Sequence, residues 1–226
     1  MNMRNVNIVA RYESKLLRRD IVFLGFVVIA LVGISLWQMI KQGRVNVFWY
    51  KVALPSSFPF FSMYYYNLVQ VLIALFVCME VVYRERKKDA MEVFLCRPFR
   101  NSEYCIGRFL GIFRMFLFVN ICVLLVCMYI NLWVVGAPFN VWIYVFYLLT
   151  LSLPTLIFVL GCALCISGMV KNRPISVLVL GLWGLGVYFY LDEWQFGAFD
   201  FWGRNLPNIF SDVVGHPDLR GYLLHR

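Results

Sequence analysis

Few side chains in this sequence have the types and spacing that catalysis or metal binding requires. Cys162 and Cys165 form a C-x-x-C motif, the arrangement used by zinc sites and redox-active dithiols. They lie in a long apolar run, however, with no second pair of this kind and no histidine nearby. The two histidines, His216 and His225, are both near the end of the chain. We therefore interpret the two cysteines as small residues that pack a helix, and we expect no metal site.

The sequence motifs of several enzyme classes are missing. No G-x-x-x-x-G-K-[ST] motif is present, so this chain cannot supply a phosphate-binding loop for ATP. Nor does the sequence contain H-E-x-x-H, G-x-S-x-G or a pair of aspartates placed for acid–base catalysis. We expect neither a catalytic residue nor a bound cofactor in this chain.

The composition places the chain in a lipid bilayer. Of its 226 residues 62% are hydrophobic and 15% are charged, which leaves too little polar surface to cover a soluble globule. Apolar runs long enough to cross a membrane as helices are predicted at about 21–40, 60–82, 109–132, 142–169 and 175–191. The predicted fold class is an all-α, polytopic helical membrane bundle, with a single transmembrane domain over residues 1–226.

The positions of Lys and Arg predict the orientation of this bundle. Positive residues concentrate before residue 20 and between residues 84 and 108, whereas the connections on the opposite side hold fewer. Because positive loops stay on the cytoplasmic side, the amino terminus is predicted to be cytoplasmic. The net charge of +9 then reflects cytoplasmic loops beside anionic lipid, so we expect membrane lipid and not nucleic acid as a partner.

Five spans with a cytoplasmic amino terminus place the segment 192–226 outside. This segment is rich in Trp and Phe, which settle at membrane interfaces, and it closes on the basic and apolar stretch RGYLLHR. We expect that a sixth span follows it in a longer protein.

Residues 5–20 are predicted to form a basic amphipathic helix that lies on the inner leaflet. At 100° per residue, five residues gather on an apolar arc, namely Val6, Val9, Tyr12, Leu16 and Leu17. Glu13 projects into the same arc, so it needs a partner or must reach the lipid headgroups. The residues of the basic arc are Arg4, Arg11, Lys15, Arg18 and Arg19.

Two more charges lie inside predicted spans, near their cytoplasmic ends. A bare charge at the bilayer centre costs about 2.5–3.5 kcal/mol or more. Glu80 and Arg114 are therefore expected to pair with each other, or Arg114 with Glu13, unless they reach the headgroups. We expect these charges to serve the structure more than the transmission of motion.

Pro154 lies in the middle of the fourth predicted span. Proline has no N–H, so it frees a backbone carbonyl one turn earlier in the helix. A kink is predicted at this position.

The connection at 84–108, between the second and third spans, holds the densest charge of the chain. Asp89 and Glu92 have the spacing of a capping box, which starts a helix. Pro98 forces Arg97 out of the helical region, so the helix must end there. A short helix is therefore predicted in the middle of the connection.

One side of this short helix is apolar, with Met91, Phe94 and Leu95. A solvated basic loop would account for the charge alone, but the apolar side needs lipid or a docked partner to cover it. Asn101 or Ser102 is expected to cap the next helix, which leads into the third span.

The connection reads ERKKDAMEVFLCRPFRNSEYCIGRFLG: charged residues, a short helix, the pair RP, and a start to the third span that contains glycine and basic residues. In this pattern and in its topology the chain resembles the membrane-spanning permease subunits of ABC-2 type transporters. The resemblance implies a coupling helix that seats in a groove of a separate ATP-binding subunit, which holds ATP and Mg²⁺. It also implies an amphipathic elbow helix before the first span, a second permease copy as a partner, export, and the cytoplasmic (inner) membrane of a bacterium.

Two functions from different classes remain open. The first is a permease subunit of an ATP-driven transporter, and the alternative is a non-transporting membrane scaffold or assembly protein that recruits a cytoplasmic partner. The spans present no row of charged residues to line an ion path, so the sequence does not name a substrate. For the first function, the resemblance assigns the coupling to Asp89, Met91, Glu92, Phe94, Leu95, Arg97 and Pro98.

Overall fold

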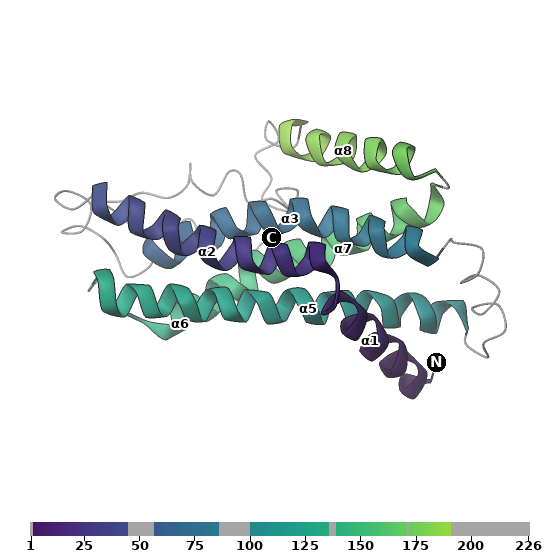
Figure 1. Ribbon diagram of the computed structural model, residues 1–226, viewed down its shortest axis with the longest axis horizontal. Helices are drawn as coiled ribbons and strands as arrows, with labels where there is room; N and C mark the ends of the chain where they lie inside the picture. The colour runs from purple at the N-terminus through teal and green to yellow at the C-terminus, as the bar shows by residue number, and fades with distance from the viewer. Residues whose placement is uncertain (1, 45–56, 86–99, 136–138, 171, 191–226) are drawn as a thin grey trace.

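The computed structural model describes residues 2–44, 57–85, 100–135, 139–170 and 172–190. At some helix ends it describes the backbone only. Within these ranges every regular element is helical, which confirms the all-α class (Figure 1). The α-helices are α1 (Met3–Leu17), α2 (Ile21–Arg44), α3 (Ser57–Glu85), α5 (Asn101–Ile130), α6 (Val141–Tyr147), α7 (Leu153–Met169) and α8 (Arg173–Tyr190). Two π-helical turns, η1 (Asn131–Val135) and η2 (Leu148–Ser152), follow α5 and join α6 to α7.

Three of the described helices are long and apolar enough to cross a membrane, at Ser62–Arg84, Asn101–Trp133 and Val141–Met169. These match the second, third and fourth predicted spans. A fourth is added if Met3–Leu17 and Ile21–Leu36, which are bent by 72° relative to each other, count as one broken span. In α8 the described apolar helix, Pro174–Gly186, is shorter. The count of five spans therefore stays a prediction.

Short polar side chains mark the helix starts. Asn2 accepts a hydrogen bond from the N–H of Arg4 at 3.1 Å and begins α1, and Asp20 accepts one from the N–H of Val22 at 2.8 Å and begins α2. Each of these bonds satisfies a backbone donor that the first helical turn leaves unpaired. The predicted cap of α5 by Asn101 or Ser102 is wrong. That helix starts one residue earlier than a cap at Asn101 allows, with Arg100 at the cap position and no side-chain bond.

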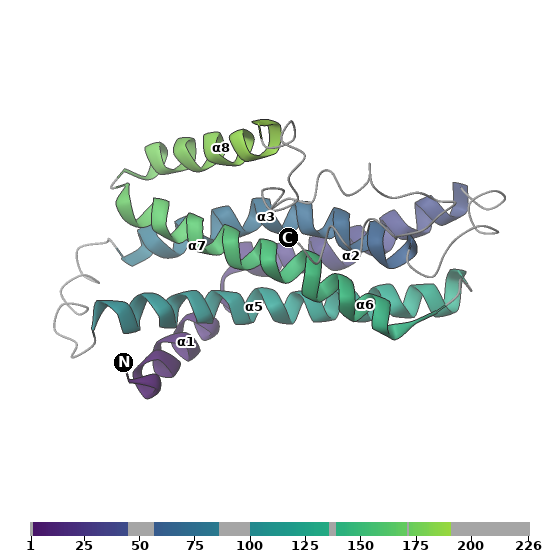
Figure 2. The ribbon, with the colours of Figure 1, turned by 180° about the vertical axis from the view of Figure 1, so that it is seen from behind.

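The long helices α2, α3, α5 and α7 run side by side and bury their apolar faces against one another (Figures 1 and 2). The ring of Phe116 on α5 packs against those of Phe23 and Phe26 on α2, with centroids 5.5 and 5.7 Å apart. The ring of Phe60 on α3 packs against that of Tyr147, 5.6 Å away, at the end of α6. These aromatic contacts tie the bundle together along its length.

Helices α3 and α7 run parallel. Phe60 meets Tyr147 near one end of the pair, and near the other the hydroxyl of Tyr83 donates to the carbonyl of Val170 at 3.1 Å. Helix α8 lies to one side of this pair and contacts both helices (Figure 1). The chain thus builds a core around α3, α5 and α7, with α1 at one end and α8 at the side.

Candidate functional site: the contacts of α1 with α3 and α5

Helix α1 packs closely against the beginning of α5, at the end of the bundle where α3 ends (Figures 1 and 2). Gly107 and Gly111, four residues apart, allow this approach. A Cβ on Gly107 would lie 2.7 Å from the Cβ of Val9, and one on Gly111 would lie 2.7 Å from that of Glu13. Both would also come within 2.8 Å of a backbone carbonyl oxygen of α1. This pair of glycines on one helix face is the spacing that lets two helices in a membrane touch.

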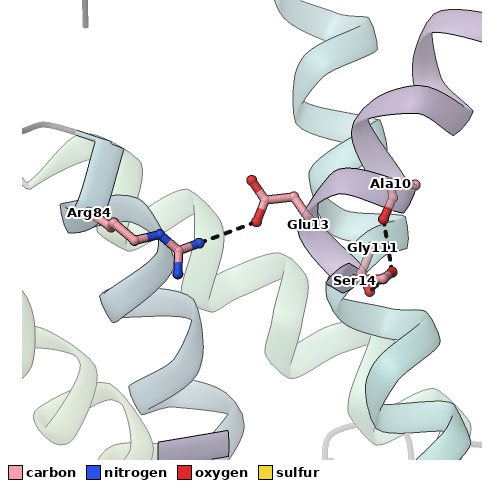
Figure 3. Close-up of polar contacts among 5 residues, drawn as sticks. All are labelled: Ala10, Glu13, Ser14, Arg84 and Gly111. Atoms are coloured by element: carbon pink, nitrogen blue, oxygen red, sulfur yellow. Dashed lines mark hydrogen bonds and ion pairs between the residues drawn. The ribbon is translucent and has the colours of Figure 1, made fainter. Parts of the chain in front are cut away.

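Polar contacts fix α1 along α5. The carboxylate of Glu103, in the first turn of α5, accepts hydrogen bonds from the backbone N–H of Asn2 at 2.6 Å and the side-chain amide of Asn5 at 3.0 Å. Near the other end of α1, the hydroxyl of Ser14 lies 2.8 Å from the carbonyl of Ala10 and 3.0 Å from that of Gly111, and can donate to either (Figure 3). The two helices are therefore joined at both ends of their contact.

An ion pair joins α1 to α3. A carboxylate oxygen of Glu13 lies 3.5 Å from the guanidinium of Arg84, close to the end of α3 (Figure 3). The Glu13 side chain is 2% exposed and that of Arg84 is 31% exposed. A carboxylate buried to this degree is stable in its ionised form only beside a positive group or hydrogen-bond donors. Arg84 therefore compensates the charge that the sequence places on the apolar arc of α1.

These contacts give α1 a particular position in the fold. Arg84 lies just before residues 86–99, and Glu103 lies just after them. Because α1 contacts both residues, it links the end of α3 directly to the start of α5. The helix ends on either side of residues 86–99 are thus held together by a third helix.

The apolar arc of α1 is buried only in part, and the buried part packs against protein, whereas Leu16 is half-buried and Tyr12 is 50% exposed. Val6, Val9 and Leu17 are all nearly inaccessible, and α1 makes most of its contacts with α5. The helix itself is present at Met3–Leu17. Its place on a membrane surface stays a prediction.

Arg114 was expected to pair with Glu80 or with Glu13, and the structure shows a different partner for it. Arg114 is exposed, and its guanidinium donates to the side-chain oxygen of Asn7 on α1 at 3.1 Å. Glu13 takes Arg84 as its ion-pair partner. Glu80 lies half-buried on α3, one turn before Arg84. Arg114 thus becomes another contact between α5 and α1, on the outer side of their interface.

Pro154 follows the π-helical turn η2 by two residues. The N–H of Leu153 donates to the carbonyl of Leu148, which is one residue further back than in a regular α-helix. This bond pairs the carbonyl of Leu148, whereas the carbonyl that the missing N–H of Pro154 leaves open is that of Thr150, four residues earlier. Residues 141–169 continue as one helical span through this irregular turn.

The seven residues assigned to coupling by family resemblance all lie in 86–99, outside the described residues. Their predicted short helix is therefore neither supported nor contradicted by the structure. They are Asp89, Met91, Glu92, Phe94, Leu95, Arg97 and Pro98.

Sequence reasoning missed a second group of polar side chains, which lies inside the bundle. The amide of Asn120 on α5 donates to the side-chain oxygen of Gln70 on α3 at 2.6 Å and to the carbonyl of Phe116 at 2.8 Å. Further along, the amide of Asn131 donates to the hydroxyl of Tyr144 at 2.7 Å. Hydrogen bonds of this kind hold membrane helices together. Amide side chains inside apolar runs were the available signal, since such residues are rare in spans.

The described residues offer little to a metal ion. Among them, no group of three or more His, Cys, Asp or Glu side chains is placed to hold one. Cys162 and Cys165 are free thiols on α7. The contacts of α1 with α3 and α5 consist of an ion pair, hydrogen bonds and close packing.

Comparison with protein-family models, curated proteins and solved structures finds no match to this chain. The resemblance to ABC-2 permeases therefore depends on the residues of the 84–108 connection and on the predicted topology. What it implies about partners and transport is carried forward as a proposal.

Proposed function

We propose that this chain is a membrane-spanning permease subunit of an ATP-driven ABC transporter, most simply an exporter in a bacterial cytoplasmic membrane. ATP and Mg²⁺ would bind to a separate subunit, and a second permease copy would complete the pathway. The observation that carries the proposal is the link made by α1 across the two ends of the connection, through Glu13 to Arg84 and through Glu103 to Asn2.

The physical reason is the way such a link transmits motion. A partner that pushes on residues 86–99 would move the end of α3 and the start of α5. Because α1 ties these two ends to each other, they would move as one unit and not separate at the connection. The displacement would then reach the long helices, which are packed together by buried apolar and aromatic side chains.

The connection also has the composition that a docked partner needs. Phe94 and Leu95 are apolar residues in a stretch of charged ones, and apolar residues that together form a surface patch are usually covered by a partner or by lipid. Seating in a groove of an ATP-binding subunit would bury them. The basic residues around them would lie at the rim of that contact, where charge contributes to specificity more than to affinity.

The test expresses the full chain together with an ATP-binding subunit from the same genome, which the proposal requires to exist. Phe94→Asp would place an unpaired charge in the groove, and burying such a charge costs on the order of several kcal/mol. The variant should therefore no longer co-purify with the ATPase or stimulate its ATP hydrolysis. Phe94→Leu, which stays apolar, is the matched control and should keep most of both. Membrane insertion should be normal in both variants.

The outcome also separates the two functions. A Phe94→Asp chain that inserts normally and still binds the ATPase with full stimulated hydrolysis would refute the coupling role. A wild-type chain that binds a cytoplasmic partner without any nucleotide-dependent transport would favour the scaffold function.

A further inference from the structure

The side of α1 that faces away from α5 carries a cluster of positive charge. Every member of this basic face is exposed. Among the described residues, none of their side chains takes part in an ion pair or a side-chain hydrogen bond. The basic face consists of Arg4, Arg11, Lys15, Arg18 and Arg19.

Most of the apolar side of α1 is not available to lipid, because it is already used in the fold. Val6, Val9 and Leu17 are exposed by 1%, 4% and 1% in their contact with α5. An amphipathic helix normally binds a membrane by inserting its apolar face between the headgroups. The large apolar side chains of α1 that stay exposed are Met3, Ile8 and Tyr12, at 67%, 51% and 50%. Because most of its apolar arc is buried and five exposed cations outnumber these three side chains, we expect α1 to attach to lipid mainly by charge.

The angle between α1 and α2 puts the basic face in the right place for such attachment. The two helices are bent by 72° relative to each other. When α2 crosses a bilayer along its normal, α1 consequently lies close to the plane of the membrane. Arg18 and Arg19 precede Ile21 and Val22, with the capping residue Asp20 between them, and Ile21 and Val22 are 84% and 66% exposed at the start of the apolar α2. The cations thus lie next to the exposed apolar surface of α2, which lipid tails would cover.

We propose that the basic face of α1 is a binding site for the headgroups of anionic phospholipids, held by charge and not by insertion of the helix. The charges of the site and of the ligand are complementary, and a cluster of about four to eight Lys and Arg beside a span is the size that recognises anionic lipid. An acidic protein surface would match the same charge. The position of the cluster at the start of an exposed apolar helix favours lipid.

This inference does not depend on the proposed transport function. It concerns only the described surface of α1, and it can be tested without a partner subunit or a substrate. The site also lies on the helix that carries Glu13, so bound lipid and the link to Arg84 share one rigid element.

The test measures lipid selectivity on the full chain in phosphatidylcholine vesicles. Trace spin-labelled phosphatidylglycerol or spin-labelled phosphatidylcholine is added, and electron paramagnetic resonance gives the fraction of each that is immobilised at the protein. We expect the phosphatidylglycerol probe to associate several-fold more strongly at low salt. At 1 M NaCl, where the screening length is about 3 Å, the preference should fall close to parity.

Two triple variants with the same loss of charge locate the site. Arg4→Gln/Arg11→Gln/Lys15→Gln should remove most of the preference for the anionic probe. Arg86→Gln/Lys87→Gln/Lys88→Gln, which removes three cations from the connection, should remove much less. Circular dichroism of both variants should match that of the wild-type chain, because the substituted residues of α1 are exposed.

Three results would overturn the proposal. The first is no preference for phosphatidylglycerol in the wild-type chain, and the second is a preference that does not respond to salt. The third is an equal loss in the two variants, which would mean that the probe reports net charge alone. If the α1 variant keeps full lipid selectivity but loses an acidic protein partner, the face is a protein-docking surface and the lipid site is refuted.

Discussion

Glu13 of α1 and Arg84 of α3 form an ion pair at 3.5 Å, in which the carboxylate is almost fully buried and the guanidinium is partly exposed. The pair explains why an apolar helix face can hold a glutamate. It also gives α1 its connection to the end of α3, while Glu103 and the two glycines give it the connection to α5.

The first prediction concerns this ion pair. Glu13→Gln keeps the shape of the side chain but leaves Arg84 without its counter-charge, and should lower the free energy of unfolding by about 1–3 kcal/mol. Arg84→Gln should cost a comparable amount, because it leaves a buried carboxylate. Unfolding in mixed micelles of a mild detergent and dodecyl sulfate, followed by circular dichroism, measures both.

The double variant Glu13→Gln/Arg84→Gln is the control for this pair. If the two residues interact directly, its cost should be clearly smaller than the sum of the two single costs. Strictly additive costs would show that the residues do not depend on each other.

The second prediction concerns the contact of α1 with α5. Gly107→Ala and Gly111→Ala each place a methyl group within 2.8 Å of a backbone oxygen of α1, so α1 must move away from α5. Overpacking of this kind typically costs about 1–3 kcal/mol. Each variant should also make α1 more susceptible to limited proteolysis.

Gly161→Ala on α7 is the matched control, since a Cβ there meets no atom within 4 Å. Alanine favours the helix over glycine by up to about 1 kcal/mol, so this variant should be neutral or slightly more stable. A similar loss of stability in all three variants would argue against a close contact specific to α1.

Much of the helical architecture could be predicted from composition and periodicity. Long apolar runs are a strong signal, and the helices at Ser62–Arg84, Asn101–Trp133 and Val141–Met169 lie close to the predicted spans. The periodicity of α1 also singled out Glu13 as a charge on the wrong face. These features depend on local sequence, which a single chain supplies in full.

The partner of Glu13 could not be predicted in the same way. It depends on how α1 crosses α5, and so on the close approach at Gly107 and Gly111. The four-residue spacing of these glycines was visible in the sequence, but nothing local indicated which helix would fill the groove. Arg114 was a reasonable candidate by depth, yet it lies on the exposed side of α5.

The third prediction concerns the orientation of the chain. The amino terminus and residue 92 should be cytoplasmic and residue 200 external, because positive residues concentrate around the first two of these positions. In a chain whose native cysteines are replaced, a cysteine at Glu92 should resist an impermeant maleimide added outside intact cells. A cysteine at Asp200 should react. Labelling of the Glu92 position from outside would reverse the predicted topology.

The last prediction concerns the amide pair inside the bundle. Gln70 and Asn120 are fully buried and joined at 2.6 Å, so either single change to Leu leaves the other amide without its partner. Hydrogen bonds between membrane helices are worth about 0.6 kcal/mol on average and up to about 1.7, and each single variant should lose stability in this range. The double variant Gln70→Leu/Asn120→Leu should recover part of the loss, because no buried amide then remains unpaired. Ile121→Leu, at an exposed neighbouring position, should change nothing measurable. A double variant that loses the full sum of the two single costs would mean that the amides serve the fold through separate contacts and not as a pair.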